Sequence, residues 1–159
     1  MPKNVTNELK LRPGFLIRRA HQVSAAILNE EFGSLGITSS QFAVLTVIEA
    51  TPDSDQISVA NIAKLDRSTM TLVMTKLERG GLVVRRQDKV DRRRKTLSIT
   101  QRGRELLITA KAKSRRARRR QLDAFTPDDA AEFMRLLRHF VETLEGGLTE
   151  QAAAELADS

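Results

Sequence analysis

The sequence predicts a mainly helical fold with one short β-hairpin. Apolar residues recur every three or four positions through most of the chain, which is the period of an amphipathic helix. Aromatic residues make up only 4% of the chain, and Trp and Tyr are missing, so we expect an aliphatic core of the kind that packed helices form. The exceptions to the helical period are 82–87 and 95–100, which are short and rich in β-branched residues.

The first half of the chain predicts four helices. A long helix is expected from Pro13 to about Phe32, and Thr38 or Ser39 should cap the next one, after two glycines. A polar loop at 51–56 precedes a short helix at 58–65, with its inward residues Val59, Ile62 and Ala63. The carboxylate of Asp66 can accept hydrogen bonds from the free amides of a fourth helix at 67–79, with its inward residues Met70, Val73, Met74 and Leu77.

The second half predicts a hairpin and two more helices. Segments 82–87 and 95–100 should pair, since only six charged residues and one Val separate them. Thr100 then caps a long helix to about Leu122, and a last amphipathic helix restarts at Pro127. A short helix, a tight turn, a second helix and a hairpin are the order of a winged helix-turn-helix, with the hairpin as its two-stranded wing.

Positive charge is concentrated in the middle of the chain. The net charge is +7, but residues 91–120 hold 13 Lys and Arg against two acidic residues. Residues 121–159 hold two Arg against nine acidic residues. A basic middle with an acidic end is typical of a surface that binds a polyanion, although a solvated helical face would account for part of the basic run.

Several function classes are not expected. No apolar run approaches the ~20 residues of a membrane span, and the N-terminal residues contain no apolar signal-peptide core. The chain has no Cys, and its two His lie far apart in the sequence, so neither a metal site nor another cofactor is predicted. No nucleophile–base pair or glycine-rich phosphate loop supports an enzyme. We therefore expect a cytoplasmic, non-enzymatic protein without a cofactor.

The predicted helix at 67–79 carries a polar stripe that fits a DNA major groove. Ser68, Thr71, Leu72 and Thr75 recur at helical spacing, opposite the apolar residues. Small hydroxyls can bond base edges or phosphates, and Leu72 can meet a thymine methyl group. Arg67 and Lys76 flank the stripe and suit phosphates. Taken alone, this helix is better explained as an ordinary amphipathic helix with a solvated polar side, since hydroxyl stripes are common.

The run "DRRRKTLSIT" (91–100) favours the DNA-binding interpretation. A hairpin tip with Arg92, Arg93 and Arg94 directly after such a helix can reach an adjacent minor groove, where narrow width concentrates negative potential. Lys89 adds to this charge, and Asp91 can orient the guanidinium of Arg93 through a paired bond.

With these motifs the sequence resembles the MarR family of bacterial transcriptional regulators over nearly its whole length. The family's wing pattern, Asp-x-Arg followed by a strand that ends in Leu-Thr, matches Asp91, Arg93 and Ile99-Thr100, with Ile for Leu. The pattern Ser-x-Ser-Thr-Val-Thr-Arg of the reading helix is matched by Asp66, Ser68, Thr69, Met70, Thr71 and Leu72. Leu72 stands where the family often has Arg.

The resemblance implies a homodimer that binds double-stranded DNA at a pseudo-palindromic operator. Residues 1–36 and 101–159 would form a helical dimerisation region intertwined with a DNA-binding region at 37–100. The terminal helices have wide apolar faces, which fits this assignment. For the basic run 115–120, solvation or pairing with acidic groups is the plainer interpretation, and binding of a ligand's phosphates or of a partner's acidic segment is the other.

The resemblance also implies release of DNA by a small aromatic acid or phenolic compound, bound between the dimer body and the reading region. The first helix offers Arg18, Arg19, His21 and Ser24 for this role. An arginine can pair with a carboxylate and His21 can bond a phenolic hydroxyl, while a CoA thioester of an aromatic acid would engage further arginines. Each residue taken singly also fits a surface Arg or a packed His. The function expected is a ligand-responsive repressor, and the alternative is a winged-helix nucleic-acid-binding protein with no small-molecule sensor.

Overall fold

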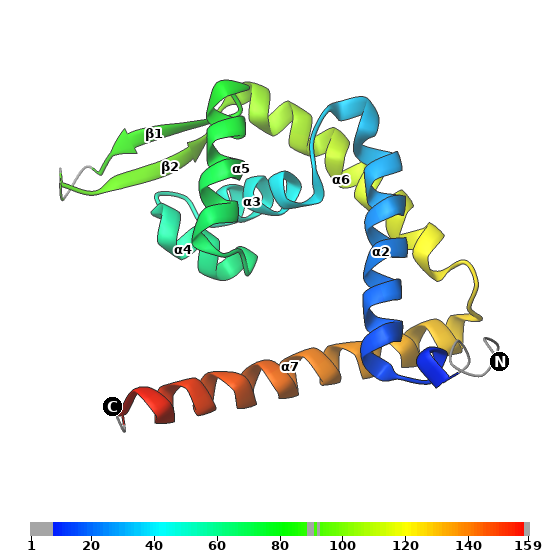
Figure 1. The fold of residues 1–159 in the computed structure, drawn as a ribbon. Helices are drawn as coiled ribbons and strands as arrows, with labels where there is room; N and C mark the ends of the chain where they lie inside the picture. Colours follow the sequence, from blue (N-terminus) through cyan, green and yellow to red (C-terminus); the bar gives the residue numbers. More distant parts are fainter. Residues whose placement is uncertain (1–7, 89–90, 92, 158–159) are drawn as a thin grey trace. The chain divides into compact units, whose positions relative to one another are not determined.

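The computed structural model describes residues 8–88, 91 and 93–157, with side chains described as far as residue 147. The mainly helical fold with a two-stranded wing is confirmed (Figure 1). Its elements are α2 (Pro13–Phe32), η1 (Gly33–Leu35), α3 (Ser39–Ala50), α4 (Gln56–Ala63), α5 (Arg67–Arg79), β1 (Val83–Gln87), β2 (Lys95–Ile99), α6 (Gln101–Leu122) and α7 (Pro127–Ala157). They belong to two compact units, Met1–Arg118 and Arg119–Ser159.

Side-chain caps set where the helices of the first unit begin. The hydroxyl of Thr38 accepts a hydrogen bond from the Gln41 amide at 3.2 Å, and the Gln41 side chain accepts one from the Thr38 amide at 2.8 Å. This reciprocal cap places the start of α3 after Thr38. Helix α4 begins two residues before its expected start at 58, because the Asp55 carboxylate accepts a hydrogen bond from the Ser58 amide at 2.8 Å.

The turn between α4 and α5 depends on a residue in the left-handed conformation. Lys64 has φ 54° and ψ 44° and ends α4. Its amide bonds back to the carbonyl of Asn61, and the Leu65 amide bonds to the carbonyl of Ala60 at 3.0 Å. These bonds satisfy carbonyls at the end of α4 and turn the chain sharply into α5.

The expected inward position of Ile62 on α4 is wrong. Val59 and Ala60 are buried and Ala63 is half-buried, whereas the Ile62 side chain is 54% exposed. At about 100° per residue the inward arc runs from Val59 through Ala63 to Ala60, which leaves Ile62 on the solvent side. On α5 the four expected inward residues are all buried.

The hairpin packs one end of its strands into the core. Strands β1 and β2 are antiparallel, with Val83 opposite Ile99 and Gln87 opposite Lys95. Val83, Leu97 and Ile99 are buried, and the distal half of the hairpin extends away from helices α3 to α5 (Figure 1). The Leu97 amide also donates to the Ser54 carbonyl at 2.9 Å, which joins β2 to the loop before α4.

The core of the first unit is aliphatic, apart from a tilted pair formed by Phe32 and Phe42, with ring centroids 5.1 Å apart. It joins the end of α2, helices α3, α4 and α5, the hairpin and the first part of α6. Its fully buried members include Phe32, Val44, Leu45, Val59, Met74, Leu77 and Leu107.

The start of α6 is held against the start of β1 by backbone contacts at Leu82. The Thr100 amide donates to the Leu82 carbonyl at 3.0 Å, and the Thr100 hydroxyl donates to the Gly81 carbonyl at 2.7 Å. The same hydroxyl accepts from the Gly103 amide at 3.0 Å and so caps α6 as expected. A Cβ at Gly103 would lie 2.2 Å from the Leu82 oxygen, so this approach requires glycine.

The basic run on α6 is partly structural. Ala110 and Ala117 are fully buried, so this side of the helix packs closely against the first unit. Arg116 lies 3.6 Å from Glu31 of α2, whose side chain is only 8% exposed, and Lys111 pairs with Glu49 of α3. Within the run, Arg116 therefore fits the acid-paired interpretation.

The second unit contains the end of α6 and the long helix α7. The Thr126 hydroxyl accepts from the Asp129 amide at 3.2 Å and caps α7, and the rings of Phe125 and Phe133 stack with centroids 5.1 Å apart. The apolar face predicted for this helix is exposed in the single chain, at 38–49% for Phe133, Leu136, Leu137, Phe140, Val141 and Leu144.

The part of the chain that the structure describes contains no helix suited to crossing a membrane. None of the helices there combines the length and the apolar character that a bilayer span needs.

We predict that Gly103→Ala destabilises the protein by about 2–3 kcal/mol, because a methyl group 2.2 Å from a backbone oxygen forces α6 away from Leu82. Urea denaturation followed by circular dichroism measures the free energy of unfolding. Gly14→Ala is the matched control, since nothing lies within 4 Å of a Cβ built there, and it should leave stability unchanged or raise it. Equal stability of the two variants would contradict the close approach.

We predict that Lys64→Gly raises the free energy of unfolding by up to about 1 kcal/mol, because glycine adopts the left-handed conformation without a Cβ clash. The same denaturation measurement applies. Lys64→Ala removes the charged side chain but keeps the Cβ, so it should not be stabilised. A gain of the same size in both variants would mean that the Lys64 side chain, and not its backbone, is unfavourable.

Candidate nucleic-acid interface

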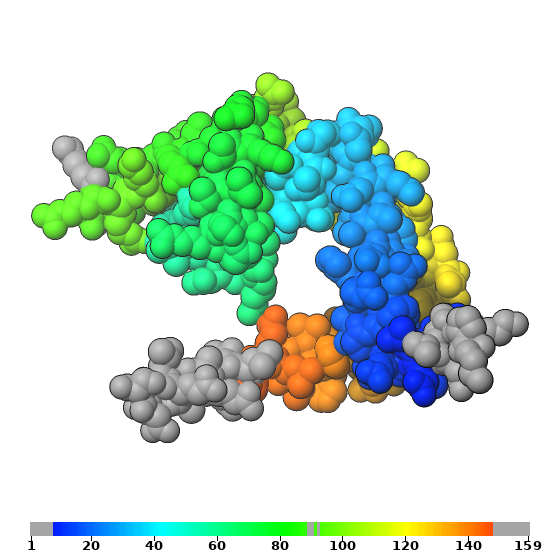
Figure 2. Space-filling view, in the orientation of Figure 1, coloured from blue at the N-terminus to red at the C-terminus, as the bar shows by residue number. Residues whose placement is uncertain are grey.

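The outer face of α5 carries the polar stripe expected from the sequence. Ser68, Thr71, Leu72 and Thr75 are exposed, and Leu72 keeps 66% of its surface accessible although it is apolar. The opposite side of the helix is buried in the core through Met70 and its apolar neighbours. Figure 2 shows α5 and the hairpin next to each other on the surface of the first unit.

Asp66 fixes the side chains at the start of this face. Its carboxylate accepts hydrogen bonds from the Ser68 hydroxyl at 2.5 Å, from the Thr69 amide at 2.8 Å and from the Thr69 hydroxyl at 2.6 Å. These bonds, with that from the Ser68 hydroxyl as the largest cause, hold the pKa of Asp66 far below its usual range. The group is therefore a carboxylate at any pH near neutral.

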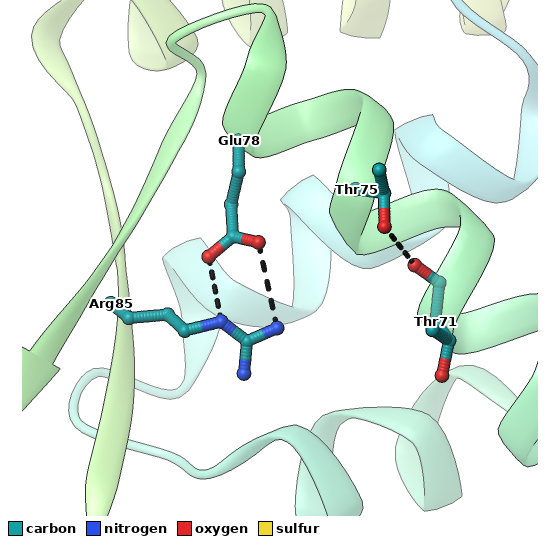
Figure 3. A network of polar contacts seen from close by, with 4 residues as sticks. All are labelled: Thr71, Thr75, Glu78 and Arg85. Atoms are coloured by element: carbon teal, nitrogen blue, oxygen red, sulfur yellow. Dashed lines mark hydrogen bonds and ion pairs between the residues drawn. The ribbon is translucent and has the colours of Figure 1, made fainter.

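The two threonines further along the face are tied to the backbone of their own helix. The Thr71 hydroxyl donates to the Arg67 carbonyl at 2.9 Å. The Thr75 hydroxyl donates to the Thr71 carbonyl at 2.9 Å, as Figure 3 shows. Such bonds to the residue four positions back hold the side chains in one rotamer. Their methyl groups and remaining oxygen lone pairs stay available at the surface.

An ion pair joins the hairpin to α5. Arg85 of β1 donates from Nε to one Glu78 oxygen at 2.6 Å and from Nη2 to the other at 3.5 Å (Figure 3). Both side chains are about one-third exposed, so the pair contributes little to stability. Its two-point geometry adds an oriented side-chain contact between the hairpin and the end of α5. The sequence did not identify this pair, because nothing in a one-dimensional pattern connects these two positions.

The loop of the hairpin differs from expectation at Asp91. Its carboxylate accepts a hydrogen bond from the backbone amide of Arg93 at 3.0 Å, and not from the guanidinium of that residue. Asp91 thus shapes the turn, in the way that short acidic side chains commonly do. Arg93 is exposed. Lys89 and Arg92 lie outside the described residues.

Arg94 is directed toward the helix-turn-helix. Its Nη2 donates to Asp55 at 2.9 Å, and the same carboxylate caps α4. Hydrogen bonds from Ser58 and then from Arg94 lower the pKa of Asp55. The sequence places Arg94 among the DNA contacts and does not single out Asp55, because their proximity arises only when β2 packs beside the loop before α4.

Exposed cations surround the stripe on α5 and the hairpin. They are Arg67, Lys76, Arg79, Arg86, Arg93 and Lys95. Long cationic side chains at the margins of a surface can reach phosphates to either side of a groove. The arrangement is therefore suited to a duplex whose bases face α5 and whose backbone runs along its margins.

The four candidate ligand residues lie on α2. Arg18 stacks over the ring of Phe15, with its guanidinium carbon 5.2 Å from the centroid, and Arg19 donates to Gln22 at 2.8 Å. Arg18, Arg19 and His21 are exposed in the single chain, and Ser24 is half-buried. Across the described residues there is no group of three or more His, Cys, Asp or Glu side chains arranged to hold a metal ion.

Known proteins resemble this chain over most of its length. The model of the MarR family matches residues 37–95. An HTH-type transcriptional repressor of Mycobacterium tuberculosis is 30% identical over 124 residues, which cover 78% of this chain and 89% of that protein.

Two solved regulators share the fold and more than a quarter of the aligned residues. The PcaV transcriptional regulator from Streptomyces coelicolor gives a TM-score of 0.74 at 33% identity, with 85% of this chain and 98% of PcaV covered, and it has also been solved with its natural ligand. The CouR protein from Rhodococcus jostii RHA1 bound to p-coumaroyl-CoA gives a TM-score of 0.71 at 30% identity. The match covers 84% of this chain and 93% of the CouR chain. CouR bound to a 23-mer DNA duplex gives a TM-score of 0.78 at 26% identity. This match covers 84% of this chain and 95% of the CouR chain.

Proposed function

This chain belongs to the MarR family of winged helix-turn-helix transcriptional regulators, and on that premise we propose that it represses transcription as a homodimer bound to a pseudo-palindromic operator. As a member of a family of DNA-binding regulators it is not an enzyme. The observation that carries the proposal is the single surface formed by α5 and the hairpin, with an uncharged polar stripe in the middle and cations at its margins.

Each part of this surface has a separate role in the proposed complex. Helix α5 enters the major groove, so that Ser68, Thr69, Thr71, Leu72 and Thr75 meet base edges. Arg67 and Lys76 bind phosphates on either side. The hairpin reaches the adjacent minor groove with Arg93, while Arg94 holds the hairpin against Asp55.

A second copy of the chain would cover the exposed apolar residues of the terminal helices. In α2 the side chains of Leu16, Ile17 and Val23 are 44–54% exposed, and α7 presents a whole apolar face. Such faces are too extensive for a monomeric surface and are typical of protein interfaces. Two-fold pairing would place two copies of α5 on successive half-sites of an operator.

The proposed effector is a small aromatic acid, a phenolic compound or an aromatic acyl-CoA. The solved regulators that resemble this chain include one bound to p-coumaroyl-CoA, an aromatic acyl-CoA, which supports a related chemistry here. Arg18 or Arg19 would pair with a carboxylate, and His21 and Ser24 would bond hydroxyl groups. For a CoA thioester, the exposed Arg115 and Arg118 of α6 are candidates for its phosphates, since Arg116 already pairs with Glu31.

The experiment that tests this function is a gel shift on the DNA that flanks the protein's own gene. We expect saturable binding of one dimer to one site, competed by the same duplex and not by random DNA. Aromatic acids and their CoA thioesters should release the complex. Specific binding with no release by any of them would favour the alternative of a nucleic-acid-binding protein without a sensor, and equal affinity for all DNA would contradict a promoter-specific regulator.

We predict that Arg93→Ala weakens operator binding by about 1–3 kcal/mol and reduces the slope of log affinity against log salt concentration by about one. The loss of one phosphate or minor-groove contact releases one fewer counterion. Arg94→Ala should weaken binding without reducing the salt slope as much, because its cation already has Asp55 as a partner. Identical salt slopes for the two variants would contradict this division of roles.

We predict that one of Arg18→Ala and Arg19→Ala blunts release by ligand while operator binding stays intact. The two side chains lie about 100° apart around α2, so only one is expected to face the ligand. An effector acts only through its different affinity for the two states of the dimer. Loss of the arginine that pairs with the ligand therefore raises the ligand concentration needed to release the operator. A titration of operator release measures this, with His21→Ala expected to have a smaller effect. Wild-type responses from all three variants would place the effector elsewhere.

A further inference from the structure

We propose that the exposed face of α5 selects A·T base pairs, with Leu72 against a thymine methyl group and the hydroxyl oxygens of the face accepting hydrogen bonds from adenine amino groups. This inference rests on the proposed DNA-binding function and adds the class of base pair that α5 reads.

The hydroxyls of α5 have a fixed direction of hydrogen bonding. Ser68 and Thr69 donate to the carboxylate of Asp66, and Thr71 and Thr75 donate to backbone carbonyls. Carboxylates and carbonyls only accept, so the single proton of each hydroxyl is committed within the protein. What each hydroxyl retains for a ligand is acceptor capacity.

Leu72 adds an apolar side chain to the same face, midway along its length. Its side chain is 66% exposed, and at about 100° per residue it lies roughly 40° around the helix from Ser68, on the side of Lys76. The threonine methyl groups add to this apolar surface. Toward a ligand, the face therefore offers oxygen acceptors and hydrocarbon.

The cationic donors of α5 lie at the margins of this face. At about 100° per residue, Arg67 and Lys76 stand roughly 90° to either side of its middle, where phosphates run. Arg79 lies on the face but a full turn beyond Thr75, at the end of the helix. The groups opposite the bases in the middle of the footprint are thus the hydroxyls and Leu72.

An A·T pair is the base pair that complements acceptors and hydrocarbon. In the major groove it presents the adenine amino group as a donor and the thymine methyl group as an apolar contact. A G·C pair also presents one amino donor, on cytosine, and two acceptors, on guanine, but it has no methyl group to meet Leu72. The preference for A·T therefore comes from the apolar contact of Leu72 with the thymine methyl group, while the adenine amino group of the same pair donates to a hydroxyl oxygen.

The first test is selection of bound duplexes from a randomised library, followed by single replacements of thymine by uracil in the selected site. Uracil lacks only the methyl group. We expect A·T pairs in the α5 footprint and at least one thymine per half-site whose replacement weakens binding about threefold to tenfold. Half-sites with G·C at these positions, or affinity unchanged by every uracil, would overturn the proposal. Failure to enrich any duplex would instead overturn the proposed function.

The second test assigns the methyl contact to Leu72. In Leu72→Ala the uracil effect should vanish at one position and persist elsewhere, because only that contact has been removed. Ile108→Ala on α6 is the matched control, since its side chain is 67% exposed and should keep the full uracil effect. If replacement of thymine by uracil weakens binding of Leu72→Ala as much as it weakens binding of the wild type at every position, Leu72 does not contact a thymine methyl group.

The third test assigns the amino contact. Replacing adenine by unsubstituted purine removes the amino donor and should weaken wild-type binding several-fold at the positions that α5 reads. Thr71→Val keeps the shape of the side chain and removes its oxygen, so one of these effects should disappear in this variant. Equal purine effects in both proteins would show that the Thr71 oxygen does not accept from a base.

Discussion

The backbone carbonyl of Leu82 is the point at which the elements of the DNA-binding surface meet. Leu82 lies between the end of α5 and the start of β1, and its carbonyl accepts a hydrogen bond from the Thr100 amide where β2 passes into α6. The Thr100 hydroxyl bonds both to the neighbouring Gly81 carbonyl and to the amide of Gly103, and the absence of a Cβ at Gly103 allows the close approach. The angle between helix, hairpin and α6 is therefore set by backbone contacts, which allow little adjustment.

Two carboxylates organise the rest of that surface. Asp55 and Asp66 each cap a helix of the helix-turn-helix, and each also holds a side chain proposed to lie near DNA, Arg94 for Asp55 and Ser68 for Asp66. Hydrogen bonds lower the pKa of both. Such a group adds stability above the pKa that it has in the unfolded chain and loses it as the pH falls through its lowered value in the fold. The surface should therefore keep its form throughout the neutral and mildly acidic range.

The large excess of positive charge serves two purposes. Arg85, Arg94 and Arg116 have acidic partners within the first unit, so they align the hairpin and join α6 to α2. Arg93 and the cations at the margins of α5 remain at the surface. Net charge thus overstates the number of groups available to a polyanion, and the proposed contacts with DNA depend on which cations the fold leaves without an acid nearby.

The sequence by itself determined the order of the elements and the face that α5 buries. Capping residues and glycines gave the starts of α3, α5 and α6, and the helical period gave the buried side of α5, because these signals are local and need no knowledge of distant residues. The tertiary structure alone decided the roles of Arg94, Arg116 and Asp91, and it reversed the inward position expected for Ile62. Charged side chains have several partners within reach, and 39 residues separate Arg94 from Asp55 in the sequence, so only the folded backbone selects the pair.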